Sequence, residues 1–224
     1  MLEQTIITHI EATTDDIKAV YTECEDFIAI GGIALYCHMY ARGLEPLIRT
    51  KDADVVCGIT SYGYIRNEFE VVFNPRMRKH EYKVTLDVGQ SEPKNVDVDV
   101  YLVFNHDLQI DNKEILAHAI RINGIKCAHL VHLLVLKIDN YKLFSGNKDS
   151  EKFSKIIHDV LQILGLIVED DLTKQLISSN FNEDRLLSLK AIIKDHSEPY
   201  DLVCKLFSLD CVMKNLCCIE KQCA

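Results

Sequence analysis

A glycine pair between an apolar segment and a predicted helix is the feature that most constrains how this chain folds. The apolar residues 27–30 are predicted as a strand that runs directly into Gly31 and Gly32, and a helix is predicted over residues 33–42. Glycines let backbone amides approach phosphate oxygens, and the amino end of a helix favours an anion. The pattern predicts a phosphate-binding turn, although it also fits an ordinary tight turn. It lacks the glycine motifs of P-loop and dinucleotide-binding sites.

Two pairs of aspartates follow on later predicted strands. Asp52 and Asp54 are separated by one residue, so on a strand their side chains share a face, where they can hold a divalent cation. Asp97 and Asp99 alternate with valines on a strand predicted over residues 96–104. A buried carboxylate costs several kcal/mol unless a nearby charge compensates it. A metal ion is one such charge, and a paired Arg or Lys is the alternative.

The glycine turn and the carboxylates together predict chemistry on a nucleoside triphosphate. Three carboxylates on two neighbouring strands suit phosphoryl or nucleotidyl transfer with two divalent ions, Mg²⁺ or Mn²⁺. One ion steadies the leaving pyrophosphate, and the other lowers the pKa of the acceptor hydroxyl.

The predicted elements change character near residue 129. Upstream, strands and helices are mixed, with further strands predicted at residues 82–88 and in a hairpin at residues 120–127. Downstream, the patterns predict helices only, over residues 129–144, 150–164, 171–179, 182–194 and 199–218. We therefore expect an α+β fold, with a mixed sheet flanked by helices at residues 1–128 and a C-terminal helical bundle at residues 129–224.

The charge balance argues against a protein whose main task is to coat nucleic acid. Lys and Arg, which neutralise phosphates, are outnumbered 25 to 34 by Asp and Glu, and the formal net charge is -9. The first residues lack the pattern of a signal peptide, and the longest apolar run, at residues 130–136, is too short to cross a bilayer. We expect a cytoplasmic protein without a membrane partner and with reduced cysteines.

The order of these motifs resembles a known superfamily. Gly-Gly-x-Ala at residues 31–34, Arg-Thr-x-Asp-x-Asp at residues 49–54 and the acidic strand after them are similar to nucleotidyltransferases of the DNA polymerase β type. The similarity is greatest to minimal bacterial members, the AbiEii and MenT-type toxins and their relatives. Leu-x-x-Leu-Lys ending at Lys137, then Lys148-Asp149 and Asp159, resemble the helices that follow the sheet in those proteins.

The resemblance covers residues 27–164 and implies a nucleotidyltransferase-like sheet and a set of site residues. The implied triphosphate and nucleotide contacts are Gly31, Gly32, Arg49, Lys137, Lys148 and Asp149. The implied metal ligands are Asp52, Asp54 and either Asp99 or Asp97. Asp99 is preferred as the third carboxylate and as the base for the acceptor hydroxyl, because an apolar run follows it as in the relatives. The stretch between Gly32 and Arg49 is longer than in the compact family pattern.

The resemblance implies a magnesium-dependent transfer of a nucleoside monophosphate from an NTP such as ATP to a hydroxyl. In the toxin branch that hydroxyl belongs to a tRNA end or a protein side chain, and an antitoxin is a partner. The alternative is a degenerate nucleotidyltransferase fold that binds nucleotide or a protein without turnover. A third hypothesis, a structural helical module with a small α/β cap, leaves the acidic residues unexplained.

Overall fold

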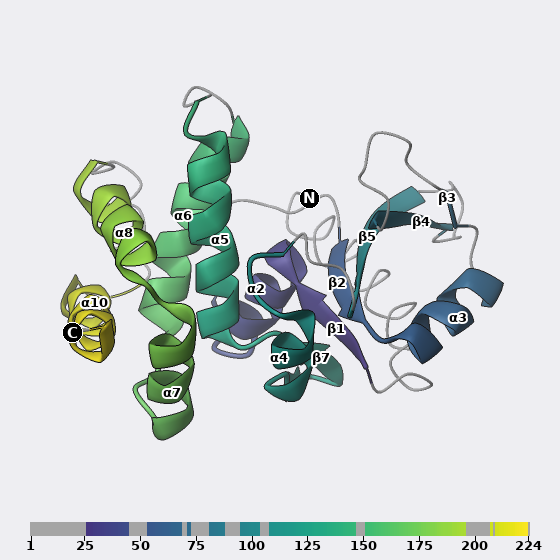
Figure 1. The fold of residues 1–224 in the computed structure, drawn as a ribbon, viewed down its shortest axis with the longest axis horizontal. Coiled ribbons are helices and arrows are strands. Elements are labelled where there is room, and N and C mark those ends of the chain that lie inside the picture. The colour runs from purple at the N-terminus through teal and green to yellow at the C-terminus, as the bar shows by residue number, and fades with distance from the viewer. Residues whose placement is uncertain are drawn as a thin grey trace. The chain divides into compact units, whose positions relative to one another are not determined.

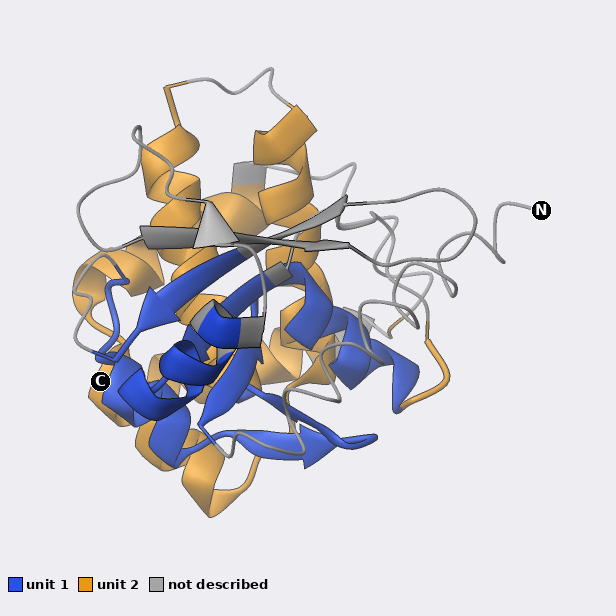
Figure 2. Ribbon diagram, turned by 90° about the vertical axis from the view of Figure 1, so that its right-hand side faces the viewer, with its two compact units in different colours: residues 1–41, 49–129 blue, residues 42–48, 130–224 orange. Residues whose placement is uncertain are grey.

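The computed structural model describes residues 26–44, 53–68, 71–72, 81–87, 95–103, 108–146, 151–195, 207 and 209–223. The chain divides into two compact units, coloured separately in Figure 2. Unit 1 comprises residues 1–41 and 49–129, and unit 2 comprises residues 42–48 and 130–224. Strands and helices are mixed in unit 1, whereas the described elements of unit 2 are helices (Figure 1).

The described strands of unit 1 form one sheet in the order β3-β4-β5-β2-β1-β7-β6 (Figure 1). Their bounds are β1 Phe27–Ile30, β2 Ala53–Cys57, β3 Val71–Val72, β4 Glu81–Asp87, β5 Asn95–Leu102, β6 Ile120–Ile122 and β7 Ile125–Cys127. The pairs β1–β7 and β2–β5 are parallel, and the other neighbouring pairs are antiparallel. The sheet is therefore mixed, and the predicted α+β fold class is confirmed.

The centre of the sheet is buried on both faces. All four residues of β1 are buried, and so are Val55, Val56 and Cys57 of β2. Unbroken apolar runs of this kind are typical of strands that are covered on both sides. Asp54 is the polar exception in this central pair of strands, since it precedes the apolar run of β2 and is only partly buried.

The described residues of unit 1 include the helices α2 Gly31–Tyr40, α3 Ile59–Glu68 and α4 Asn112–Ala117. The prediction placed the start of α2 after the glycines, but the helix includes both of them. Gly31 has a φ of 62°, which lets the chain turn sharply from β1 into the helix. No helix was predicted at α3, which contains Gly63, a residue type that disfavours helix.

The amino end of α3 is held by a residue that is distant in the sequence. The backbone N–H of Gly58 donates to the carbonyl of Asp26 at 3.1 Å, and the Ser61 hydroxyl donates to the Asp26 carboxylate. These bonds satisfy polar groups at the start of the helix that have no partner within it. They anchor α3 to the residue that directly precedes β1.

Unit 2 is a set of packed helices, as predicted. The described helices are α5 Leu130–Phe144, α6 Glu151–Leu166, α7 Asp171–Asn180, α8 Glu183–Asp195 and α10 Leu209–Cys223. α5 packs against α6, α7 and α8, and α10 packs against the same three helices. The last helix was predicted from residue 199, and residues 199–206 lie outside the described part of the chain.

Three of the described cysteines lie in the interior of unit 1. Cys37, Cys57 and Cys127 of unit 1 are buried. A hydrogen bond with Cys37, followed by burial, holds the pKa of the Cys127 thiol well above its usual value. A thiol whose pKa is raised carries little thiolate at neutral pH, so Cys127 behaves as a small apolar residue.

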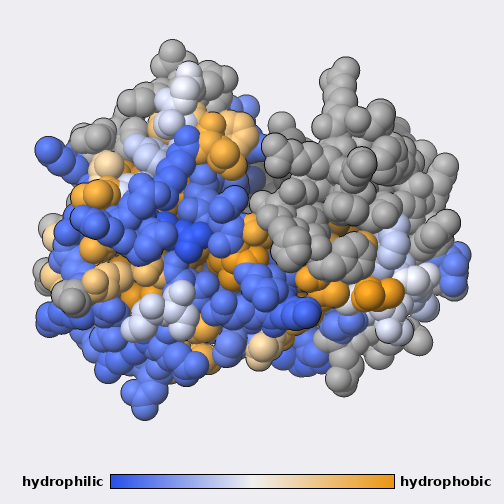
Figure 3. Space-filling model, in the orientation of Figure 1, coloured by the Kyte–Doolittle hydropathy of each residue, from blue (hydrophilic) through white to orange (hydrophobic). Residues whose placement is uncertain are grey.

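The surface of unit 2 is mostly hydrophilic on the face shown in Figure 3. Among the described residues of unit 2, the large exposed apolar ones are Leu143, Val168, Leu187 and Met213, which lie on different segments. Single exposed apolar residues are ordinary on protein surfaces. None of the helices in the described ranges is both long enough and apolar enough to cross a membrane.

The amino end of α7 offers a test of the helix boundaries. The Asp170 carboxylate accepts a hydrogen bond from the backbone N–H of Thr173 at 2.7 Å, which is an N-cap interaction. We expect Asp170→Ala to lower the free energy of unfolding by about 1 kcal/mol in urea titrations. Gln175→Ala, at an exposed position inside the same helix, is the control and should have little effect. Equal losses in the two variants would contradict the cap.

Candidate functional site in unit 1

The sheet brings Asp54 and Asp99 together. β2 and β5 are parallel neighbours, and their register pairs Asp54 directly with Asp99. Residues paired in this way project from the same face of a sheet, on strands about 4.8 Å apart. Both residues are partly buried. Two carboxylates from positions far apart in the sequence therefore lie side by side at one point of unit 1.

Gly31 lies against the carboxylate of Asp54. β1 is the other neighbour of β2, and Ile30 pairs with Asp54 in the antiparallel register. A Cβ atom built on Gly31 would overlap Oδ2 of Asp54 and would lie 3.0 Å from its Cγ. Residue 31 must therefore be glycine for two reasons, its positive φ and the closeness of the Asp54 carboxylate.

The amino end of α2 begins at the same place. Its N-cap residue, Ile30, is extended and makes no side-chain hydrogen bond to the helix, and the first turn contains no acidic residue. Gly31 and Gly32 are both only partly buried. The dipole of a helix is positive at this end, so the carboxylate of Asp54 lies in a favourable field. The same end can bind the phosphates of a ligand.

The donor set at this point fits a hard divalent cation. Mg²⁺ is bound in proteins through one or two carboxylates together with waters and substrate phosphates. Asp54 and Asp99 would supply the carboxylates, and the backbone that Gly31 leaves uncovered permits a close approach. The chemistry of the residues present is therefore compatible with the predicted Mg²⁺ or Mn²⁺.

Several predicted site residues are not placed by the structure. Asp52, Arg49, Lys148 and Asp149 lie outside the described residues. For Asp97 only the backbone is described, which pairs with Thr85 of β4. The assignments of these five residues stay predictions.

Lys137 lies in unit 2, on α5, where it forms an ion pair with Asp159 of α6. Its Nζ atom is 2.6 Å from Oδ2 of Asp159, and the side chains are 12% and 2% exposed, respectively. The prediction placed Lys137 at a triphosphate. The structure adds a carboxylate partner from the next helix, which the spacing of the sequence did not assign.

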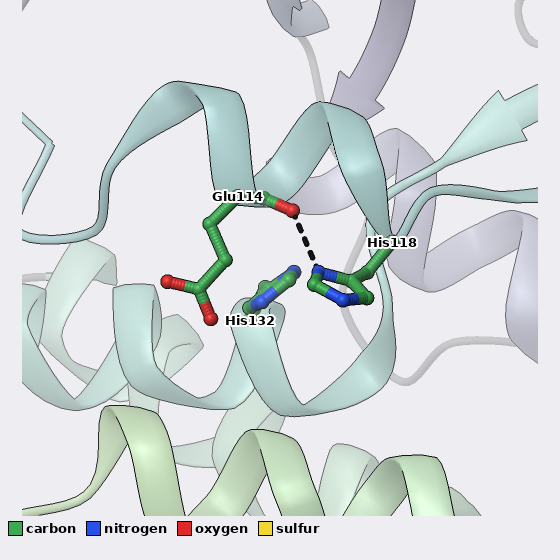
Figure 4. A group of neighbouring side chains, drawn as sticks. All are labelled: Glu114, His118 and His132. Atoms are coloured by element: carbon green, nitrogen blue, oxygen red, sulfur yellow. Dashed lines mark hydrogen bonds between the residues drawn. The ribbon is translucent and has the colours of Figure 1, made fainter.

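A further pair of metal-binding residue types was missed by the sequence analysis. Glu114 lies in α4, and His118 is the residue directly after that helix. A carboxylate oxygen of Glu114 and a ring nitrogen of His118 lie within 4.8 Å of each other. His118 Nδ1 is also 3.1 Å from the backbone carbonyl of Glu114 (Figure 4). The spacing of one helical turn is the signal that could have identified the pair. His132, also drawn in Figure 4, belongs to unit 2 and is completely buried in α5.

The fold was then compared with proteins of known structure. An antigenic nucleotidyltransferase-like protein from Paracoccidioides brasiliensis is similar over 89% of this chain and 92% of its own, with a TM-score of 0.52 and 17% sequence identity. The fold is nucleotidyltransferase-like. JHP933 from Helicobacter pylori aligns over 97% of this chain and 91% of its own, with a TM-score of 0.49 and 15% identity. No family profile and no curated protein matches the sequence significantly.

The nucleotidyltransferase-like fold class that the sequence predicted is confirmed. The described sheet and the helices after it agree with the nucleotidyltransferase-like fold that the sequence predicted. At 17% identity the likeness concerns the fold, and it does not identify the toxin branch.

The close approach of Gly31 and Asp54 can be tested by adding one methyl group. Gly31→Ala combines a positive φ, which costs about 1–2 kcal/mol, with an overlap against Asp54, which costs about another 1–3 kcal/mol. Gly43→Ala is a matched control, because Gly43 has a φ of 68° and no atom within 4 Å of the added Cβ. We expect Gly31→Ala to lose more stability in urea unfolding. If both variants lose the same amount, Asp54 does not lie against Gly31.

The ion pair of Lys137 generates a second test of stability. Lys137→Met leaves the carboxylate of Asp159 buried without its cation, and we expect a loss of roughly 3–5 kcal/mol. Lys142→Met is the control on the same helix, because its nearer partner Asp184 is 78% exposed and its other partner, Asp139 at 3.9 Å, keeps Arg185. An exposed pair is worth about 0–1 kcal/mol. Similar losses in the two variants, measured by urea unfolding, would mean that Asp159 is not buried.

Proposed function

We propose that this protein is a divalent-metal-dependent nucleotidyltransferase, which moves a nucleoside monophosphate from an NTP to a hydroxyl group. The observation that carries the proposal is the register of β2 and β5, which pairs Asp54 with Asp99 beside Gly31. The nucleotidyltransferase-like fold supports it as well. The proposed site is completed by Asp52 and by the triphosphate contacts predicted from the sequence.

In the proposed reaction, the acceptor hydroxyl attacks the α-phosphorus of the NTP. The new oxygen–phosphorus bond replaces the bond to the β-phosphate, and pyrophosphate leaves. Asp99 takes the proton of the hydroxyl, and Asp54, on the neighbouring strand, would hold a divalent ion together with Asp99. The backbone at Gly31 and Gly32 binds the triphosphate, because glycine leaves its N–H groups accessible. Bound Mg²⁺ or Mn²⁺ would supply positive charge to the phosphate oxygens and lower the pKa of the hydroxyl.

We assign the transfer chemistry to residues 1–128 and treat residues 129–224 as a separate helical domain. Lys137, with Lys148 and Asp149, is proposed to contact the nucleotide from that domain. We further propose a cytoplasmic role in which the acceptor is a tRNA end or a protein side chain, as in the toxins that the motifs resemble. An antitoxin would then be the natural partner.

The proposal predicts metal-dependent transfer that requires both aspartates. We expect label from an α-³²P-labelled NTP to appear on total tRNA or protein with Mg²⁺, to disappear with EDTA and to return when Mn²⁺ is added. Asp99→Asn should reduce the rate about 10²–10⁴-fold, as expected for loss of a general base. Asp54→Asn should reduce it similarly, and Asp171→Asn, at an exposed position of α7, is the control.

Two outcomes would contradict the proposed function. Unchanged transfer in Asp54→Asn would separate the activity from the paired carboxylates. Magnesium-dependent NTP binding without transfer to any acceptor would favour the alternative of a degenerate fold that binds nucleotide without turnover.

A further inference from the structure

The ion pair between Lys137 and Asp159 is unevenly buried. Asp159 is 2% exposed, whereas Lys137 retains 12% of its side-chain exposure. The more exposed partner of the pair is therefore the lysine, whereas the carboxylate is shielded from solvent.

The position of Asp159 within α6 explains this arrangement. Asp159 lies inside a run of buried residues from Ile156 to Leu164, so its carboxylate is surrounded by the core between the helices. Lys137 reaches it from α5, which packs against α6. An ammonium group has three N–H donors, and its nitrogen lies 2.6 Å from one carboxylate oxygen of Asp159, with which it forms an ion pair. The same group can also donate to a second acceptor.

A buried ion pair commonly adds little to the free energy of unfolding. The desolvation of two charges commonly offsets their attraction, and an apolar pair of similar volume is often as stable. Another ion pair on α5 between partly buried groups is different, because Arg185 donates to both oxygens of Asp139 at 3.1 and 2.7 Å and also to the carbonyl of Asn180. That guanidinium ties three segments together, whereas Lys137 contacts a single carboxylate atom in the described structure.

We propose that Asp159 is a positioning residue that holds the ammonium group of Lys137 in one place, so that its remaining N–H groups bind the polyphosphate chain of a nucleoside triphosphate. The inference rests on the proposed function for the identity of the ligand. It adds a role for Asp159, which contacts no substrate itself. A lysine side chain has many rotamers, and fixing it before the ligand arrives lowers the entropy lost on binding.

The test measures nucleotide affinity and folding stability in the same set of full-length variants. A non-hydrolysable ATP analogue with Mg²⁺ and AMP are titrated by calorimetry, and urea unfolding is followed separately. In Asp159→Asn the lysine loses its fixed carboxylate, and we expect affinity for the triphosphate analogue to fall about tenfold while AMP affinity stays the same. A merely structural defect would weaken both ligands together. Lys142→Met is the control and should bind both ligands like the wild type.

A double variant keeps the test independent of folding. Lys137→Met combined with Asp159→Leu replaces the ion pair by an apolar pair, which we expect to unfold at nearly the wild-type urea concentration. Its affinity for the triphosphate analogue should still be lost at least tenfold, whereas AMP should bind normally.

The outcomes distinguish this inference from the proposed function. If Asp159→Asn or the double variant binds the triphosphate analogue as well as the wild type does, the pair is structural and the inference is wrong, while the proposed function stands. If the wild type binds no nucleotide with Mg²⁺, both are wrong.

Discussion

The contact between the carboxylate of Asp54 and the backbone of Gly31 is the constraint on which the described site depends. It requires a glycine at residue 31, and it fixes where β1 ends and α2 begins. Because β2 lies between β1 and β5, the same strand that brings Asp54 to Gly31 also brings it to Asp99. A turn, a helix terminus and two carboxylates are thereby assembled by the order of three strands.

The sequence predicted those parts that depend on local patterns. The apolar segment before Gly31, the alternation around Asp99 and the hairpin at Asn123-Gly124 each have a short-range physical cause, and each appears in the structure as a strand or a turn. The helices of unit 2 were predicted because their apolar residues recur with helical spacing. The glycine pair was assigned to a turn, and the structure shows in addition that it forms the first residues of α2.

The sequence could not predict what depends on contacts between distant residues. The register that pairs Asp54 with Asp99 follows from the order of strands, which no local pattern specifies. Helix α3 follows β2 in the sequence, whereas Asp26, which anchors it, precedes β1. The weak helix propensity of the α3 residues was therefore misleading. Asp159 was recognised only as part of a motif, and its partnership with Lys137 required the packing of α5 on α6.

The central claim is that Asp54 and Asp99 together hold a divalent metal at Gly31. The most direct measurement is the anomalous scattering of Mn²⁺ in crystals grown with a non-hydrolysable NTP. The account predicts a peak about 2.1 Å from carboxylate oxygens of both Asp54 and Asp99, with the triphosphate next to Gly31. A manganese peak at another place, for example at Glu114 and His118, and no peak at the two aspartates would contradict the account.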